Sequence, residues 1–278
     1  MRNLCKSFAL VLILLSAFSS CSKKGCTDPM SLAYDVEAKK DDGGCTYPEV
    51  SKKTLLIRKT GDWCLYCGEH ATEFVDEVER NYSSTVKVMD LHYNDGFAVD
   101  VGYNLISALG TMSTPGFAVG SEIQSLNYTQ ISQAINSDIL LTPEVNMDLN
   151  FSIQDGKMNI NIHSLLSPGN NGDNFFLAAY ILEDGQIGNQ KIAGYVDPTT
   201  GTNVNPNFTH NNILRTEGSG SGNPFGNLLE FDADGNNITS LSDIILAPST
   251  IWNHDNLYVV AVVWQQDGSG YRFVNLEN

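Results

Sequence analysis

Between residues 52 and 141, short apolar runs alternate with segments in which apolar residues recur every three or four positions. Short apolar runs predict strands at 54–57, 86–92 and 116–119. Apolar residues at three- and four-residue steps predict helices over 67–82, 97–109 and 128–138. Strands that alternate with helices predict an α/β domain over 52–141. Its boundary is expected at Leu141-Thr142-Pro143, where the helical pattern breaks.

After Pro143 the period becomes two. Apolar and polar residues alternate over 145–153 and again over 158–162, and Asp155-Gly156 supplies a hairpin turn between them. Further strands are predicted at 175–182, 213–214, 257–264 and 271–274. The segments 197–208 and 218–222 are expected to be exposed loops. The pattern predicts an all-β part, an antiparallel β-sandwich over 142–278.

The motif Trp63-Cys64-Leu65-Tyr66-Cys67 falls between the first predicted strand and the first predicted helix. Cys64 is then expected where the helix begins, and the unpaired N–H groups and dipole of a helix start stabilise a thiolate. Cys67 lies one turn further on and can close a disulfide with Cys64. The motif in this context resembles the redox site of a thioredoxin-like fold, with Cys64 and Cys67 as catalytic residues and Trp63 as a supporting one.

Two other positions bear on this resemblance. Pro115 precedes the apolar run 116–119, and in thioredoxin-like folds a proline there is cis and faces the C-x-x-C; the alternative is an ordinary trans turn proline. Such enzymes usually carry an acid six positions before the first cysteine, where this chain has Arg58. An arginine cannot accept a proton, so the acid–base relay is in doubt. An Arg58 that points inward would still favour a thiolate electrostatically. We expect it instead to face solvent or the register to be shifted.

The histidines receive separate predictions. His92 ends a predicted strand beside the redox site and is a candidate for proton transfer. His70 extends the motif to Cys64-x-x-Cys67-x-x-His70, but a structural zinc site needs four ligands and no fourth is evident, so no metal is expected. His210 is expected to pair structurally with Arg215. No cofactor is predicted.

The start of the chain resembles a bacterial lipoprotein signal. Arg2 and Lys6 precede an apolar run over 8–18 that is too short to anchor a helix in a bilayer, and small residues lead to Cys21. We expect residues 1–20 to be removed and Cys21 to be lipidated, so that the membrane is a partner through the lipid. The alternative is plain secretion with cleavage near Ser20.

Residues 21–51 form a predicted small module. Cys26 and Cys45 are left without another role and should pair in an oxidising envelope. The sequence around them resembles a module of surface and secreted Bacteroidetes proteins. Its aspartates could hold calcium, although a solvated acidic loop stapled by one disulfide explains them more simply; they are Asp28, Asp35, Asp41 and Asp42.

A formal net charge of −16 excludes nucleic acid as a partner, since phosphate would be repelled. From about residue 52 onward the chain resembles the outer membrane protein 28-related family of Bacteroidetes. Four stretches carry this resemblance: T-G-D-W-C-L-Y-C-G-E, L-H-Y-N-D, F-T-H-N-N-I-L-R and Y-V-V-A-V-V-W-Q-Q-D-G-S-G-Y-R-F-V-N. It implies a thioredoxin-like domain followed by a β-domain, anchored in the outer membrane, with an adhesin or receptor role suggested for the family.

Two functions are open at this point. In the first, an envelope lipoprotein, periplasmic or surface-exposed, exchanges thiols and disulfides with a protein substrate through Cys64 and Cys67. In the second, a non-enzymatic surface lipoprotein binds a ligand and uses the thioredoxin-like fold as a scaffold. The intact W-C-x-x-C favours the first function, and the size of the β part favours the second.

Overall fold

The computed structural model describes residues 22–278, so the predicted signal peptide and Cys21 lie outside the described residues. The chain divides between Thr46 and Tyr47 into two units, each of which is described by itself. In the first unit a disulfide joins Cys26 to Cys45. The aspartates there are engaged in turns and ion pairs: Asp41 and Asp42 accept backbone N–H groups two residues on, and Asp35 pairs with Lys23 at 2.8 Å.

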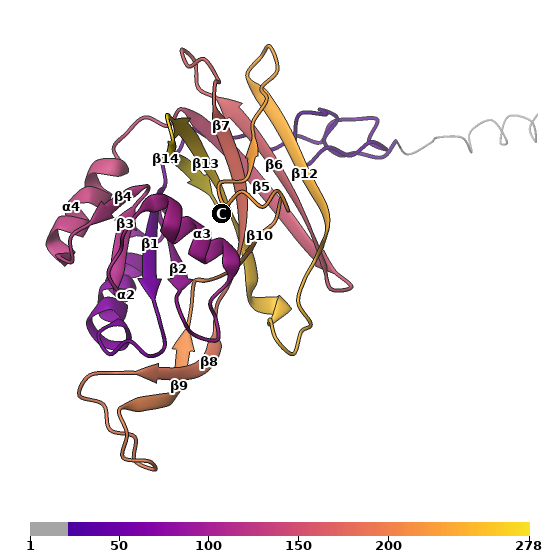
Figure 1. Ribbon diagram of the computed structural model, residues 1–278. Helices are drawn as coiled ribbons and strands as arrows, with labels where there is room; N and C mark the ends of the chain where they lie inside the picture. Colours follow the sequence, from indigo (N-terminus) through magenta and orange to yellow (C-terminus); the bar gives the residue numbers. More distant parts are fainter. Residues whose placement is uncertain (1–21) are drawn as a thin grey trace, which may run out of the picture. The chain divides into compact units, whose positions relative to one another are not determined.

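The second unit is a mixed α/β structure in which strands predominate (Figure 1). Its described part contains a nine-stranded sheet with the order β14-β13-β7-β10-β2-β1-β3-β4, and β11 lies beside β7. Their bounds are β1 Thr54–Thr60, β2 Val86–His92, β3 Gly116–Val119, β4 Glu122–Gln124, β7 Phe175–Glu183, β10 Ile213–Glu217, β11 Asn227–Leu228, β13 Leu257–Asp267 and β14 Gly270–Glu277. β2 runs parallel to β1, whereas β3 runs antiparallel to it.

Helical segments occur at all three predicted places, and one further short turn was not predicted. They are η1 Cys67–Ala71, a π-helical turn, α2 Thr72–Tyr82, α3 Asp100–Leu109, α4 Tyr128–Asp138 and the 3₁₀ turn η2 His254–Asn256. α4 has the predicted bounds, and the Asn127 side chain caps it by accepting the N–H of Gln130. α3 begins three residues later than predicted. The Asp95 carboxylate accepts the N–H of Phe97 at 2.9 Å, and Val99 is extended.

Apolar side chains cover both faces of the sheet around β1. On one face, α2 and α4 pack through Phe74, Val78 and Ile131 against Leu56. On the other face, α3 packs through Leu105 in a core cluster that also includes residues of β7 and β13. The alternation along β1 therefore sends successive residues into two different cores.

A second sheet has the order β12-β6-β5, with β5 Val145–Gln154, β6 Lys157–Leu166 and β12 Asn236–Ile245. The predicted hairpin turn joins β5 to β6, with Asp155 and Gly156 both at positive φ. One face of this sheet packs on β7 and β13 through residues such as Met147, Ile160 and Ile181. The alternation in 145–162 thus reflects one buried face. β12 was not predicted from the sequence; it is an edge strand in which Ile238 and Ile245 are exposed.

The two sides of the predicted boundary near residue 141 share the large sheet. β10 lies next to β2, where Ile213 pairs with Asp90 and the N–H of Asp90 donates to the carbonyl of Asn212 at 2.8 Å. A separate two-stranded hairpin consists of β8 Gln186–Lys191 and β9 Val204–His210, and we call residues 186–210 the arm. The arm stands out at the lower edge of Figure 1. The loop expected over 197–208 is therefore wrong in part, since 204–208 belong to β9.

Candidate functional site

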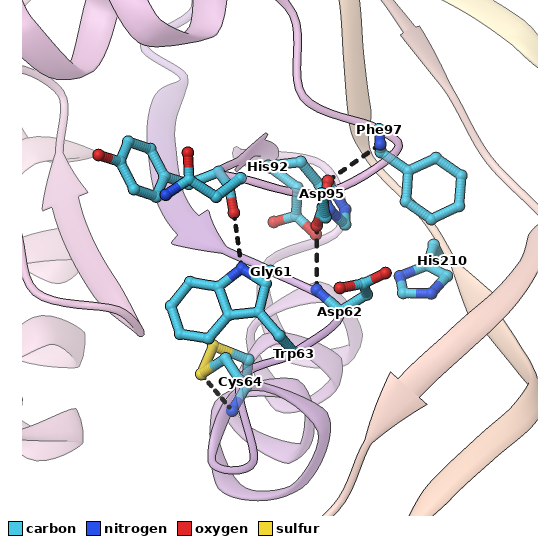
Figure 2. Close-up of polar contacts among 12 residues, drawn as sticks. Gly61, Asp62, Trp63, Cys64, His92, Asp95, Phe97 and His210 are labelled. Atoms are coloured by element: carbon cyan, nitrogen blue, oxygen red, sulfur yellow. Dashed lines mark hydrogen bonds and ion pairs between the residues drawn. A yellow bond between two sulfur atoms is a disulfide. The ribbon is translucent and has the colours of Figure 1, made fainter.

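The segment that leads to the cysteines is fixed by polar contacts on both sides (Figure 2). After β1, the indole N–H of Trp63 donates to the carbonyl of Tyr93 at 2.8 Å, and the N–H of Asp62 donates to the Asp95 carboxylate at 2.9 Å. A Cβ on Gly61 would lie 2.7 Å from Trp63 Nε1, so only glycine fits at this turn. These contacts fix the direction in which the chain enters the motif.

Cys64 and Cys67 form a disulfide at the start of the helical segment. The helical segment begins at Cys67, as the apolar pattern predicted, so Cys64 lies three residues before the first helical residue rather than at the helix start. The backbone N–H of Cys67 points back to Cys64 Sγ at 3.2 Å, which is the contact that would stabilise a thiolate on Cys64. Both cysteines are buried, at 5% exposure for Cys64 and 1% for Cys67.

Pro115 lies at the end of β1 that leads to the motif. The Thr114–Pro115 peptide bond is cis, as predicted. Gly116 pairs with Lys59 in the sheet, so the register places Pro115 beside Thr60, the last residue of β1. Pro115 thus lies at the end of β1 from which the chain continues to the cysteines.

Arg58 does not face solvent, and that prediction is wrong. Its guanidinium forms a bidentate pair with the Asp90 carboxylate on β2, where Nε donates to Oδ1 at 2.8 Å and Nη2 donates to Oδ2. Burial alone would lower the pKa of Arg58, but the pair with Asp90 raises it above its ordinary value. Nη1 also donates to the Thr72 hydroxyl, which donates in turn to the carbonyl of Cys67 at 2.8 Å.

Asp90 was missed in the sequence. The sequence could have revealed it as the single acid inside the apolar strand Val86–His92. A charged side chain in a strand that is buried on both faces requires a partner. The partner sits directly opposite, since Arg58 and Asp90 are register partners on β1 and β2. The position that carries an acid in the resembled fold therefore carries a cation, already neutralised by Asp90.

His92 lies in a buried polar cluster next to the motif. Its Nδ1 is 2.6 Å from Asp95 Oδ2, and the His210 ring packs 5.4 Å from the His92 ring. Burial alone would raise the pKa of Asp95, but its hydrogen bond with His92 brings that pKa below its ordinary value. Burial, and then the neighbouring His92, lowers the pKa of His210 to about 4. His210 is therefore neutral at physiological pH.

The predicted pairing of His210 with Arg215 is wrong. Arg215 Nε donates to the Glu183 carboxylate at 2.6 Å, and its guanidinium lies over the Phe97 ring. His210 instead packs against Phe97, whose ring lies 4.8 Å from the His210 ring, and its Nε2 is 3.1 Å from the carbonyl oxygen of Asn189. His210 thereby attaches the end of the arm to the core.

The arm also lies directly on the C-x-x-C segment, a contact that the sequence did not predict. The Gln190 amide donates to the carbonyls of Cys64 at 3.0 Å and Gly61 at 3.3 Å. The N–H of Lys191 donates to the carbonyl of Asp62 at 2.7 Å. A Cβ on Gly68 would lie only 2.5 Å from the carbonyl oxygen of Lys191, so the arm and helix are in close contact.

Three apolar side chains around the cysteines reach solvent. Trp63, Leu65 and Tyr66 are 40%, 37% and 61% exposed, whereas the two cysteines beside them are buried. His70 is exposed as well, and its ring stacks on Tyr66. Within residues 22–278, no helix is long and apolar enough to cross a membrane.

Comparison with solved structures finds a related fold in HBP35 of Porphyromonas gingivalis. The two chains share 17% sequence identity with a TM-score of 0.63, and the alignment covers 83% of this chain and 76% of that chain. At this identity the likeness concerns the fold alone. No family model and no curated protein matches the sequence.

Proposed function

We propose that this chain is a cell-envelope lipoprotein whose thioredoxin-like domain exchanges thiols and disulfides through Cys64 and Cys67. One observation carries the proposal: the Cys64–Cys67 disulfide sits at a helix start, and the Cys67 N–H points at Cys64 Sγ. The surroundings support it. The strand order β2-β1-β3-β4 with β3 antiparallel, and a cis proline directly before β3, are what the resemblance to that fold requires.

The proposed reaction transfers two electrons and conserves atoms. In the reduced protein the Cys64 thiolate attacks a substrate disulfide, forms a mixed disulfide and releases one substrate thiolate. Cys67 then loses its proton and attacks Cys64 Sγ. This second step closes the Cys64–Cys67 disulfide and releases the other substrate thiolate. Both substrate thiolates take up protons, so the protein is oxidised as the substrate is reduced. The reverse sequence oxidises a substrate dithiol.

Position 58 carries arginine, so no carboxylate there can accept the proton that Cys67 loses. The Arg58 guanidinium instead reaches the Cys67 backbone carbonyl through Thr72, while its charge is balanced by Asp90. The Arg58–Asp90 pair therefore adds no net charge beside the cysteines. The proposal therefore assigns Arg58 a positioning role through Thr72.

A trapping experiment tests the proposal. In a Cys67→Ala variant, Cys64 cannot be resolved, so its mixed disulfide with a substrate thiol should accumulate. In the reduced protein with both cysteines, substoichiometric iodoacetamide near neutral pH should label Cys64 ahead of Cys67, because only Cys64 receives the helix-start N–H. A Cys64→Ala variant is the matched control and should trap nothing. A pair that resists reductants able to open ordinary catalytic disulfides would be structural and would end this proposal.

A second candidate function is a non-enzymatic surface lipoprotein that binds a ligand. The observation that favours it is the burial of the disulfide, since cysteines at 5% and 1% exposure resemble those of a structural bond more than those of an open catalytic one. In that case the thioredoxin-like domain over 52–141 is a scaffold for the β-sandwich over 142–278. Resistance of Cys64–Cys67 to reduction is the outcome that selects this function.

The cellular setting belongs to the same proposal. We infer an origin in the Bacteroidetes envelope, with anchorage in the outer membrane through lipid on Cys21 and the disulfide-bonded module following the anchor. The lipoprotein-like start of the sequence and the fold shared with the Porphyromonas gingivalis protein support it. The disulfide in the 22–46 unit also fits an oxidising compartment.

A further inference from the structure

The arm holds the C-x-x-C segment mainly through backbone atoms of that segment. The Gln190 side chain of the arm is 2% exposed, and its amide nitrogen donates to three carbonyl oxygens, those of Gly61, Cys64 and Lys191. The neighbouring Lys191 N–H donates to Asp62. One side-chain amide therefore joins both sides of the contact between the arm and the motif.

The arm also closes tightly on the helix start. A Cβ at position 68, where the chain has glycine, would meet Lys191 O at 2.5 Å, Gln190 Cγ at 2.7 Å and Ile192 Cγ1 at 2.8 Å. At the other end of the arm, the ring of His210 packs between Phe97 and Phe208. The arm is thus attached at two places, one on the motif and one on the His92 cluster, and Cys64 and Cys67 are buried in this arrangement.

We propose that the arm makes the Cys64–Cys67 pair selective for low-molecular-weight thiols over protein thiols, and that Gln190 is the specificity-determining residue. The inference rests on the proposed thiol–disulfide exchange. A thiolate must approach the attacked sulfur along the S–S axis, and a protein thiol can do so only if its surrounding surface docks against the site. A small dithiol needs only a narrow path. The arm lies against the backbone of the motif, and in this proposal it takes up surface on which a protein thiol would have to dock while a small thiol needs none of it.

The test compares two reductants on the same protein. Reduction of Cys64–Cys67 is followed with dithiothreitol and, in parallel, with a reduced thioredoxin as a protein reductant. In the unaltered protein, dithiothreitol should open the bond while the protein reductant reacts slowly. In Gln190→Ala, the rate with the protein reductant should rise by about tenfold, because the lost buried hydrogen bonds shift the arm toward an open state by that order. The dithiothreitol rate should change by less than about twofold on the same argument.

A second variant opens the arm by a different route. Gly68→Ala places a methyl group against Lys191 O and should raise the rate with the protein reductant without removing any hydrogen-bonding group. Gly102→Ala is its matched control, since a Cβ there meets nothing closer than 3.8 Å. Lys191→Ala is the control for Gln190→Ala, because the exposed Lys191 side chain is lost while its N–H remains. Hydrogen exchange at the Lys191 N–H reports arm opening in each variant.

The outcomes separate the two claims. Two results would overturn the selectivity and leave thiol–disulfide exchange intact. The first is that both reductants reduce the Cys64–Cys67 disulfide of the unaltered protein at equal rates. The second is that the ratio of the two rates does not change in Gln190→Ala and Gly68→Ala although hydrogen exchange at the Lys191 N–H becomes faster. Failure of dithiothreitol to reduce the pair in every variant overturns the exchange function itself, and the selectivity with it.

Discussion

Arg58 and Asp90 lie opposite each other on β1 and β2, and they form a charge pair almost out of contact with water. Their side chains are 9% and 1% exposed. Removing two charges from water is costly, and the pair is stable only because the bidentate geometry and the Thr72 hydroxyl satisfy the guanidinium. An isolated carboxylate at the Asp90 position would have no such compensation.

Arg58→Met should therefore destabilise the protein by about 3–5 kcal/mol, since it leaves the Asp90 carboxylate buried without a partner. The double variant Arg58→Met/Asp90→Leu should recover most of that loss, because two apolar side chains replace both charges. Urea unfolding of the single and double variants measures the free energy of unfolding. A double variant no more stable than Arg58→Met would show that the charge pair is not the source of the loss.

At the scale of elements, the arm depends on a histidine that must stay neutral. His210 ends β9, and it faces charged or titratable groups on neighbouring elements: His92 and Arg58 lower its pKa, and Asp95 raises it. Burial is the largest cause, and the resulting pKa of about 4 compares with an ordinary value of 6.5. The unfolded chain binds the proton more readily than the folded one. His210 therefore contributes stability above pH 6.5 that is lost as the pH falls toward 4.

We expect acid to destabilise the protein less when this ring is absent. His210→Gln keeps a donor for Asn189 but cannot titrate. Between pH 7 and pH 5 its free energy of unfolding should fall by about 2 kcal/mol less than that of the unaltered protein, since 1.4 kcal/mol corresponds to one pH unit. Urea unfolding at the two pH values measures this difference. His254→Gln, which also replaces a ring bonded to a backbone carbonyl, is the control; equal slopes in both variants would contradict the prediction.

The elements that the sequence predicted well are those with a complete local pattern. α4 and β2 have the expected bounds, because each shows its apolar period over its whole length and α4 has an Asn cap. β8 was missed because Q-I-G-N-Q-K has too few apolar residues to show a period. Its contacts with Gly61 and Cys64 join positions more than 120 residues apart, which no local pattern encodes.

On the scale of the whole molecule, the two parts predicted from the apolar pattern, residues 52–141 and 142–278, both contribute strands to one sheet. Continuity rests on the single parallel pair between Ile213 and Asp90, beside Asn212, whose amide donates to Glu79. The sequence predicted both halves, since each has its own period, but the pairing of β10 with β2 joins residues far apart in the chain, which no local period reveals. The candidate cysteines were likewise evident in the motif, whereas the arm that contacts the backbone of this segment was not.

The largest-scale prediction concerns the attachment of the chain to a membrane. Cys21 follows a short apolar run and small residues, so we expect it to carry lipid at the mature N-terminus. Cys21→Ser should move the protein from the membrane fraction to the soluble envelope fraction, because one lipid-bearing residue supplies the apolar contact with the bilayer. Mass spectrometry of the N-terminal peptide should show the lipid on the unaltered protein and not on the variant. Ser22→Ala, one residue further on, is the matched control and should remain in the membrane fraction. Unchanged membrane partition of Cys21→Ser would contradict the anchor and would favour plain secretion with cleavage near Ser20.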